Sequence, residues 1–327
     1  MTDSLQQKEQ KAIDAIKLAS RLSETYYHEP LIICYSGGKD SECILHLALR
    51  AGIEFEVLNS HTTVDPPEVV YHIRNVKKEL ESVGIKFTIR MPTYKGKPTS
   101  MWKLIEDKKM PPTRLTRYCC SVLKEGGTPN RVAAVGVRAA ESKKRSGRDY
   151  FWAWKSNFKD VKYLSIEHVA EQFDSSLKAA EELKQSPEQA DSFDCEFIAL
   201  AKQKDEIVVN PIYEWTDTDV WEYIKSYNVP YCELYDKGFD RLGCLLCPLS
   251  SYKKRKREAE LYPIYKDNYI KAFGRMLVAR RKAGRNDFDG RGKWTDAISV
   301  YRWWMEEPDL RGQLKIVDID MNIGEET

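Results

Sequence analysis

Residues 36–41 read Ser-Gly-Gly-Lys-Asp-Ser and combine the residue types that bind a phosphate group. Two adjacent glycines allow the backbone to curl closely around an anion, because glycine tolerates conformations that other residues avoid. The serine hydroxyls and the first amides of a helix that begins near Asp40 can donate hydrogen bonds, and the lysine adds a positive charge. The pattern predicts a phosphate-binding loop made of Ser36, Gly37, Gly38, Lys39, Asp40 and Ser41.

The spacing within this loop excludes two common phosphate-binding motifs. Residues 36–41 lack both the Gly-x-x-x-x-Gly-Lys spacing of a Walker loop and the spaced glycines of a dinucleotide-binding turn. An apolar run, residues 31–35, precedes the loop and an amphipathic segment follows it, which is the layout of a strand, a turn and a helix. An ordinary glycine turn between strand and helix is the alternative.

The chain has eight cysteines, and four of them form two close pairs. Cys119 and Cys120 are adjacent, and Cys244 and Cys247 form a C-x-x-C pattern. In a chain that lacks a secretion signal, such pairs favour metal binding or catalysis over disulfides. Adjacent cysteines can each take one corner of an iron–sulfur cluster, whereas they fit a single tetrahedral ion poorly. We expect a cluster, with zinc or buried free thiols as alternatives.

Composition indicates a soluble chain of one large or two modest domains. It has 327 residues, a net charge of +2 and no apolar run near the roughly 20 residues that a membrane span requires. The first residues lack the apolar core of a secretory signal, so we expect a cytoplasmic protein without a membrane partner. Two basic stretches, residues 253–257 and 280–293, fit either a nucleic-acid partner or a solvated helix face.

Alternating strands and helices must position the loop. The apolar patterns predict, in chain order, helix 5–27, strand 31–36, helix 40–51, strand 55–60, helix 67–83 and strand 86–91. This alternation predicts an α/β fold with a doubly wound, mainly parallel sheet and right-handed crossovers. Ligands of such sheets bind outside the carboxyl ends of the strands, where the loop and Asn59 would both lie. We therefore expect Asn59 to take part in nucleotide binding.

The second half of the chain continues this pattern less regularly. Residues 133–137 and 206–212 predict two further buried strands, and residues 166–191 predict a charged helix. Thr216 or Asp217 would then cap another helix, whose buried side we expect to comprise Val220, Trp221 and Ile224.

No linker marks a clear domain boundary. We divide the chain into an α/β domain, residues 1–215, and a helical C-terminal region, residues 216–327, with one continuous domain as the alternative. The C-terminal region holds Trp294, Trp303 and Trp304. We expect these tryptophans to belong to the core, because large aromatic residues at helical spacing usually pack.

The loop resembles the PP-loop of the ATP pyrophosphatases over all of residues 36–41. The resemblance implies an adenine nucleotide α-hydrolase-like fold that binds ATP and cleaves it between the α and β phosphates. It also implies Mg²⁺, because the charge of the leaving pyrophosphate must be neutralised. Lys39 and Asp40 would be catalytic, and Asp40 would help to hold the ion.

Further segments resemble the phosphoadenylylsulfate (PAPS) reductase superfamily. Residues 136–145 look like its G-x-R-x-x-E-S-x-x-R segment, and residues 210–221 and 234–238 look like its P-I-x-x-W-T-x-x-D-V-W and L-Y-x-x-G segments. The resemblance implies that Arg138 and Arg145 grip a phosphate or sulfate catalytically, with a salt bridge to a neighbouring carboxylate as the alternative. It implies nucleotide contacts by Gly136, Glu141 and Ser142.

The cysteines resemble those of assimilatory adenylylsulfate reductases, in which they carry a four-iron four-sulfur cluster. The resemblance implies the same ligands here, namely Cys119, Cys120, Cys244 and Cys247. Two features depart from the reductases, whose C-terminal segment carries a nucleophilic cysteine and whose loop has usually diverged. Here residues 316–327 contain no cysteine, and the loop at residues 36–41 is intact.

This combination resembles the ATP-pyrophosphatase members of DNA phosphorothioation systems of the Dnd and Ssp type. The resemblance implies a sulfurtransferase component that adenylates a DNA phosphate oxygen and receives sulfur from a cysteine desulfurase. Other modification-complex subunits and a second copy of the chain are further expected partners. A tRNA thiolase, a reductase-like enzyme acting on sulfonucleotides, and a non-catalytic nucleotide-sensing subunit are the alternatives.

Overall fold

The computed structural model describes residues 1–124, 128, 130–143, 145–154, 162–189, 196–202, 206–285 and 294–306. It contains two compact units, each built from separate stretches of the chain. The sheet unit comprises Met1–Asn59, Pro67–Arg90 and Gly127–Leu242, and the helical unit comprises Ser60–Pro66, Met91–Gly126 and Gly243–Thr327. The two domains expected from the sequence, residues 1–215 and residues 216–327, are each one continuous stretch of the chain. This domain division stays a prediction.

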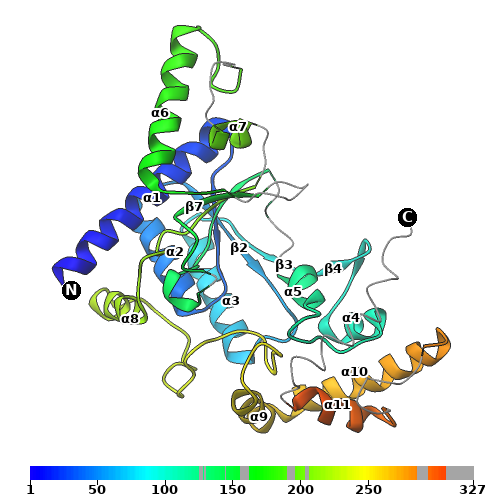
Figure 1. The fold of residues 1–327 in the computed structure, drawn as a ribbon. Coiled ribbons are helices and arrows are strands. Elements are labelled where there is room, and N and C mark those ends of the chain that lie inside the picture. Colours follow the sequence, from blue (N-terminus) through cyan, green and yellow to red (C-terminus); the bar gives the residue numbers. More distant parts are fainter. Residues whose placement is uncertain are drawn as a thin grey trace. The chain divides into compact units, whose positions relative to one another are not determined.

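A seven-stranded sheet organises the sheet unit (Figure 1). Its strands, in spatial order, are β3 (Phe87–Arg90), β2 (Phe55–Ser60), β1 (Leu31–Cys34), β6 (Val132–Ala134), β9 (Glu206–Val209), β7 (Phe151–Trp154) and β8 (Lys162–Leu164). β1 runs parallel to β2 and β6, and β6 runs parallel to β9. The expected doubly wound, mainly parallel sheet is confirmed. The sequence did not predict β7 and β8, which are antiparallel.

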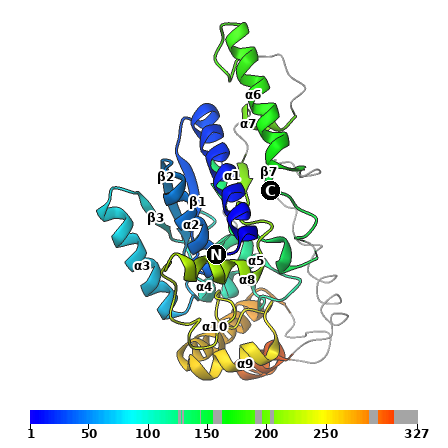
Figure 2. The ribbon, with the colours of Figure 1, turned by 90° about the vertical axis from the view of Figure 1, so that its left-hand side faces the viewer.

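Helices flank this sheet. They are α1 (Asp3–Tyr27), α2 (Lys39–Ala51), α3 (Pro67–Ser82), the short 3₁₀ helix η1 (Ala139–Glu141), α6 (Ile166–Glu182), α7 (Glu196–Lys202) and α8 (Asp217–Ser226). α1 packs along α2, as Figure 2 shows. Its buried face includes Ile16, Ala19 and Leu22, all fully inaccessible to solvent. α1 thereby covers α2, the helix that follows the predicted loop.

Three predicted elements end three or more residues earlier than expected. The strand predicted over residues 133–137 stops at Ala134. The helix predicted over residues 166–191 stops at Glu182, and residues 190–191 lie outside the described part of the chain. The strand predicted over residues 206–212 stops at Val209. Pro211 follows and cannot donate a ladder hydrogen bond, and the Tyr213 amide closes a turn on the Asn210 carbonyl.

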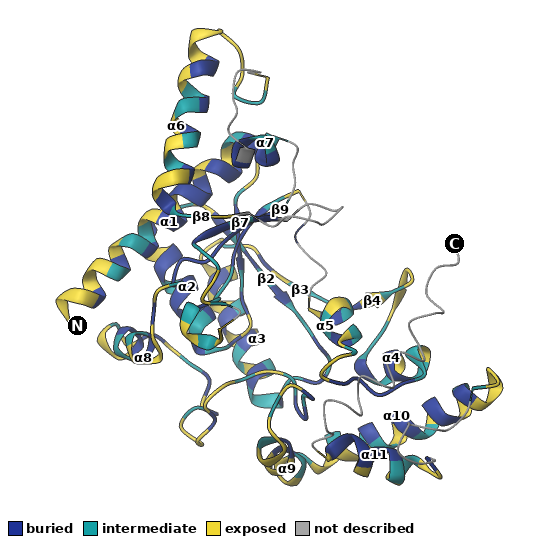
Figure 3. Cartoon of the chain, in the orientation of Figure 1, coloured by how far each residue is buried: buried dark blue, intermediate teal, exposed yellow. Residues whose placement is uncertain are grey.

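The helical unit has its own apolar core. Its elements are β4 (Thr93–Tyr94), β5 (Lys97–Pro98), α4 (Met101–Lys108), α5 (Tyr118–Leu123), α9 (Tyr252–Leu261), α10 (Pro263–Lys282) and α11 (Ala297–Met305). Trp304 packs against Tyr269 and Phe273 of α10, and Trp294 packs against Trp303. All three tryptophans are buried, which confirms their expected place in the core. Figure 3 shows buried segments along α10 and α11.

Some predictions fall outside the described residues. These concern the cysteine-free tail at residues 316–327 and part of the second basic stretch, residues 286–293. Of the helices in the described part of the chain, none combines the length and apolarity that crossing a membrane would take. The cytoplasmic location stays a prediction.

Candidate nucleotide-binding site

The predicted loop links β1 to α2 at the carboxyl end of a central parallel strand. Gly37 has a φ of +72°, and a Cβ there would lie 2.9 Å from Ile73 Cγ1, so the position requires glycine. Ser41 Oγ accepts a hydrogen bond from the Ser36 amide at 3.2 Å and donates one to the Gly38 carbonyl at 2.8 Å. These bonds fix a tight turn, and α2 starts at Lys39 without a side-chain cap from Gly38.

Lys39 and Arg138 form a charge network with two carboxylates in the sheet unit. Lys39 Nζ lies 2.9 Å from Asp217 Oδ1 and 3.6 Å from Asp40 Oδ2. Arg138 Nη2 lies 3.0 Å from the same Asp217 oxygen. Arg138 Nε lies 2.6 Å from Asp40 Oδ1, an ion pair whose angle is not that of a hydrogen bond. The structure thus brings three of the four predicted catalytic residues together.

Partial burial would raise the pKa of Asp217, but hydrogen bonds and charges from Lys39 and Arg138 outweigh it and hold this pKa below its ordinary value. Burial raises the pKa of Tyr235, whose hydroxyl oxygen accepts a hydrogen bond from the Lys39 amide at 2.9 Å. Tyr235 therefore stays neutral and binds one of the first amides of α2. At neutral pH Asp217 is therefore ionised, whereas the Tyr235 hydroxyl keeps its proton.

Two further predicted nucleotide residues, Gly136 and Asn59, lie beside the loop residues. A Cβ on Gly136 would lie 3.1 Å from Asp40 Cβ, so this glycine leaves room for Asp40. Asn59 Nδ2 donates to the Tyr35 carbonyl at 2.8 Å, which holds the start of the loop. Asn59 is buried and supports the loop from β2.

Arg145 is paired with a carboxylate in this structure. It forms an ion pair with Glu141, whose other oxygen lies 3.6 Å from Arg241 Nη2. Glu141 Oε2 also accepts a hydrogen bond from the Arg138 amide at 3.1 Å, and the Ser142 carbonyl accepts one from the Arg145 amide at 2.9 Å. The salt-bridge alternative describes Arg145 here, and Arg138 is the arginine that contacts the residues of the loop.

Sequence reasoning missed several residues that hold the loop. Tyr35 and His72 both contact the buried carboxylate of Glu42, so residues on either side of the loop are tied together. From the sequence, Asp217 is a candidate helix cap, and Tyr235 is only one residue of the segment 234–238. The structure buries Glu42 in the first turn of α2, and a buried carboxylate requires partners such as Tyr35 and His72.

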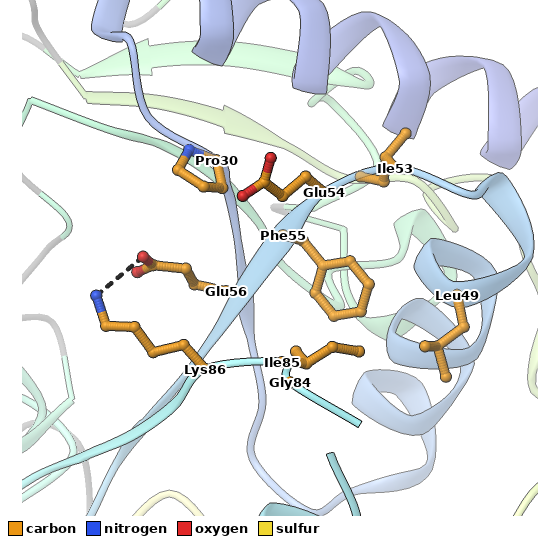
Figure 4. A pocket seen from close by; sticks show the side chains of 9 residues that line it. All are labelled: Pro30, Leu49, Ile53, Glu54, Phe55, Glu56, Gly84, Ile85 and Lys86. Carbon is orange, nitrogen blue, oxygen red and sulfur yellow. Dashed lines mark hydrogen bonds and ion pairs between the residues drawn. The ribbon is translucent and has the colours of Figure 1, made fainter. Parts of the chain in front are cut away.

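A pocket lies at the opposite edge of the sheet, at the amino ends of β1, β2 and β3 (Figure 4). Its volume is about 380 Å³, and its lining comprises Pro30, Leu49, Ile53, Glu54, Phe55, Glu56, Gly84, Ile85 and Lys86. The Lys86 ammonium pairs with Glu56 at 2.9 Å across its rim. None of the predicted site residues lines it, so it is separate from the loop.

The paired cysteines all belong to the helical unit. Cys119 and Cys120 lie in α5, and Cys244 and Cys247 lie in the loop before α9. That loop is pinned at Leu245, whose amide donates to the Val64 carbonyl at 2.8 Å, and at Leu246, whose amide donates to a Glu258 oxygen at 2.7 Å. Hydrogen bonds from two of its own amides, one to a carbonyl and one to a side-chain carboxylate, thus hold the C-x-x-C loop.

The thiols influence one another. A hydrogen bond to Cys120, then burial, then the charges on Cys120, Cys244 and Cys247 raise the pKa of Cys119. The same hydrogen bond lowers the pKa of Cys120, helped by Arg117. Within the described residues, no three His, Cys, Asp or Glu side chains gather as a site for one metal ion. The cluster stays a prediction.

Comparison with known families identifies the superfamily. The phosphoadenosine phosphosulfate reductase domain matches residues 30–250, so the chain belongs to that family. Membership supports a nucleotide-binding enzyme related to the sulfonucleotide enzymes. The match includes the loop, the charge network and all four paired cysteines.

Individual relatives are distant or match over short stretches. An uncharacterized protein of Methanocaldococcus jannaschii is 26% identical over 97% of this chain and 62% of its own length. An adenosine 5'-phosphosulfate reductase of Oceanobacillus iheyensis is 46% identical over 16% of this chain and 22% of its own length. The chain spans less than two thirds of each of these curated relatives.

Solved structures match only in part. A phosphoadenylyl-sulfate reductase from Candida auris has 14% identity and a TM-score of 0.42 over 75% of this chain and 96% of that chain. An FMN adenylyltransferase from Candida glabrata has 15% identity and a TM-score of 0.40 over 75% of this chain and 66% of that chain.

Proposed function

We propose that the sheet unit binds the polyphosphate of ATP and cleaves it between the α and β phosphates, adenylating an acceptor. The observation that carries this proposal is the convergence of Lys39 and Arg138 on one oxygen beside the glycine loop. Both cations are buried and point to a place where an anion already sits. The loop geometry favours a phosphate as the ligand, because Gly37 lets the backbone approach closely and α2 begins at Lys39, which places the positive end of the helix dipole at the loop.

The reaction needs no covalent enzyme intermediate. An acceptor oxygen attacks the α-phosphorus, the bond from that phosphorus to the bridging oxygen breaks, and pyrophosphate leaves with the electron pair. Lys39 and Arg138 would neutralise charge on the phosphates. Mg²⁺, when bound, would offset the charge of the leaving pyrophosphate, and Asp40 would help to hold it.

We assign the helical unit to sulfur delivery and nucleic-acid binding. Cys119, Cys120, Cys244 and Cys247 would hold a four-iron four-sulfur cluster, and a cysteine desulfurase would supply the sulfur. Within the basic run at residues 253–257, Lys253, Lys256 and Arg257 are exposed and would suit a phosphate backbone. DNA is the acceptor proposed first, in phosphorothioate modification, and tRNA is the alternative acceptor.

Pyrophosphate released from ATP, with and without DNA, tests the adenylating activity. We expect Lys39→Ala to abolish release while leaving the circular dichroism spectrum unchanged. Lys225→Ala removes an exposed lysine from α8 of the same unit and should keep full activity. Normal release by Lys39→Ala would reject the role assigned to the loop.

A reductase-like activity on a sulfonucleotide is the second candidate. It is favoured by the local match to adenosine 5'-phosphosulfate reductases, at 46% identity over 52 residues. Sulfite formed from adenylylsulfate with a thiol reductant, in the absence of ATP, would select this candidate. Pyrophosphate release without sulfite would select the adenylating one.

A further inference from the structure

Asp217 lies where a bound phosphate would meet the two buried cations of the sheet unit. Its Oδ1 is 2.9 Å from Lys39 Nζ and 3.0 Å from Arg138 Nη2. Two cationic donors would meet on a non-bridging phosphate oxygen in the same way. We propose that Asp217 is a stand-in anion, which fills the phosphate position until phosphate binds and then moves out. This inference rests on the proposed function in taking the loop as phosphate-binding.

Differences in burial indicate that Asp217, and not Lys39 or Arg138, moves when phosphate binds. The side chains of Lys39 and Arg138 are 4% and 5% exposed, whereas that of Asp217 is 64% exposed. Buried cations need a partner at all times, because an unpaired buried charge is costly. The exposed carboxylate can instead move into water. Asp40 and the Trp215 carbonyl, which accepts from Arg138 Nη1 at 3.3 Å, would keep the guanidinium in place.

The charge balance shows why the carboxylate must leave. Lys39 and Arg138 carry two positive charges, and their contacts Asp40 and Asp217 carry two negative ones, so this network has no net charge. A phosphate entering such a network gains little attraction while Asp217 remains. Withdrawal of Asp217 leaves one net positive charge for the ligand. Removing its charge by mutation should therefore strengthen phosphate binding.

Capping of α8 does not explain this carboxylate. The capping box is formed by Thr216 and Asp219: Thr216 Oγ1 accepts from the Asp219 amide at 3.1 Å, and Asp219 Oδ2 accepts from the Thr216 amide at 2.7 Å. Asp219 lies in the same first turn as Asp217 and pairs with Lys8 at 2.7 Å. It offers a matched control, since Asp219→Asn removes an equal charge from the same helix end.

Isothermal titration with inorganic pyrophosphate, without added metal, tests the inference on the full chain. We expect Asp217→Asn to bind pyrophosphate about three- to tenfold more tightly than the unchanged protein, with a smaller gain at high salt. Asp219→Asn should bind like the unchanged protein. If Asp217 only supported the fold, Asp217→Asn would bind pyrophosphate more weakly. The sign of the change in affinity therefore separates the two explanations.

Three results would overturn the inference: unchanged or weaker binding by Asp217→Asn, an equal gain in Asp219→Asn, or no pyrophosphate binding by any of the three proteins. Pyrophosphate release from ATP is measured in parallel. If Asp217→Asn binds pyrophosphate more tightly but the unchanged protein releases none from ATP, the stand-in anion is supported and the proposed enzymatic activity is rejected. If the unchanged protein releases pyrophosphate but Asp217→Asn does not bind it more tightly, the activity is supported and the stand-in anion is rejected.

Discussion

The sheet unit and the helical unit hold their candidate sites by different means. In the sheet unit, buried Lys39 and Arg138 are already neutralised by Asp40 and Asp217, and Gly37 leaves the room that the turn needs. In the helical unit, Cys119, Cys120 and Cys244 lie in or against an apolar core, and hydrogen bonds from two backbone amides hold the C-x-x-C loop. The first site therefore depends on charge and close approach, and the second on packing around reactive sulfurs.

Gly37→Ala should have the largest effect, and on the sheet unit alone. A left-handed backbone costs a non-glycine residue about 1–2 kcal/mol, and overpacking against Ile73 adds about 1–3 kcal/mol. We expect a loss of this size in the free energy of unfolding of the sheet unit and no pyrophosphate release. Gly84→Ala is the matched control, because Gly84 has a φ of +84° and open space around its Cβ position. Equal effects of both substitutions would show that close packing at the loop is unimportant.

Cys244→Ala should separate the two sites. We expect anaerobically purified protein to lose most of its iron and its visible absorption, because one ligand of the proposed cluster is removed. Binding of inorganic pyrophosphate should stay unchanged, since Cys244 belongs to the helical unit. Cys34→Ala, in the sheet unit, should keep its iron. If the unchanged protein is colourless and binds zinc, the cysteines hold a structural zinc ion and the cluster assignment is wrong.

The basic run of α9 divides into an inner and an outer set. Arg255 stacks 4.4 Å from the Trp304 ring centroid and donates to the Trp304 carbonyl at 2.8 Å, and burial lowers its pKa to about 10. Arg255→Ala should cost about 2–3 kcal/mol of stability, measured by urea unfolding. Lys256→Ala should change stability by less than about 0.5 kcal/mol yet weaken DNA binding at low salt. A larger loss of stability in Lys256→Ala than in Arg255→Ala would contradict this division. Unchanged DNA binding by Lys256→Ala would leave the outer set as a solvated face without a nucleic-acid partner.

The chain's local patterns predicted the loop because all its parts are adjacent in sequence. The apolar strand, the glycines and the helix start occupy residues 31–51, so periodicity and turn chemistry alone located them. Tyr235 could not be found this way, because it reaches the Lys39 amide across 196 residues of chain. Asp217 was equally hidden, since an acidic residue at a helix start has a sufficient local explanation.

The basic run shows a second limit of reasoning from composition. Five consecutive cations look like one surface, but helical periodicity turns Arg255 and Glu258 to the same inner side. β7 was missed for a related reason. Its four residues, Phe151–Trp154, follow a long polar segment, and a short run gives little periodicity to detect.

The smallest expected effect is on the pH dependence of the unfolding free energy, and it concerns the sheet unit alone. The pKa of Asp217 is lowered in the folded protein, so its ion pairs stabilise the sheet unit above the ordinary carboxyl pKa of 3.8. This contribution is lost as the pH falls through the lowered pKa. We therefore expect the difference in unfolding free energy between the unchanged protein and Asp217→Asn to be constant near neutrality and to shrink below about pH 4. Because the carboxylate is largely exposed, the difference should be small and should fall with added salt. A difference that grows on acidification would mean that Asp217 is protonated more easily when folded, which contradicts its pairing with Lys39 and Arg138.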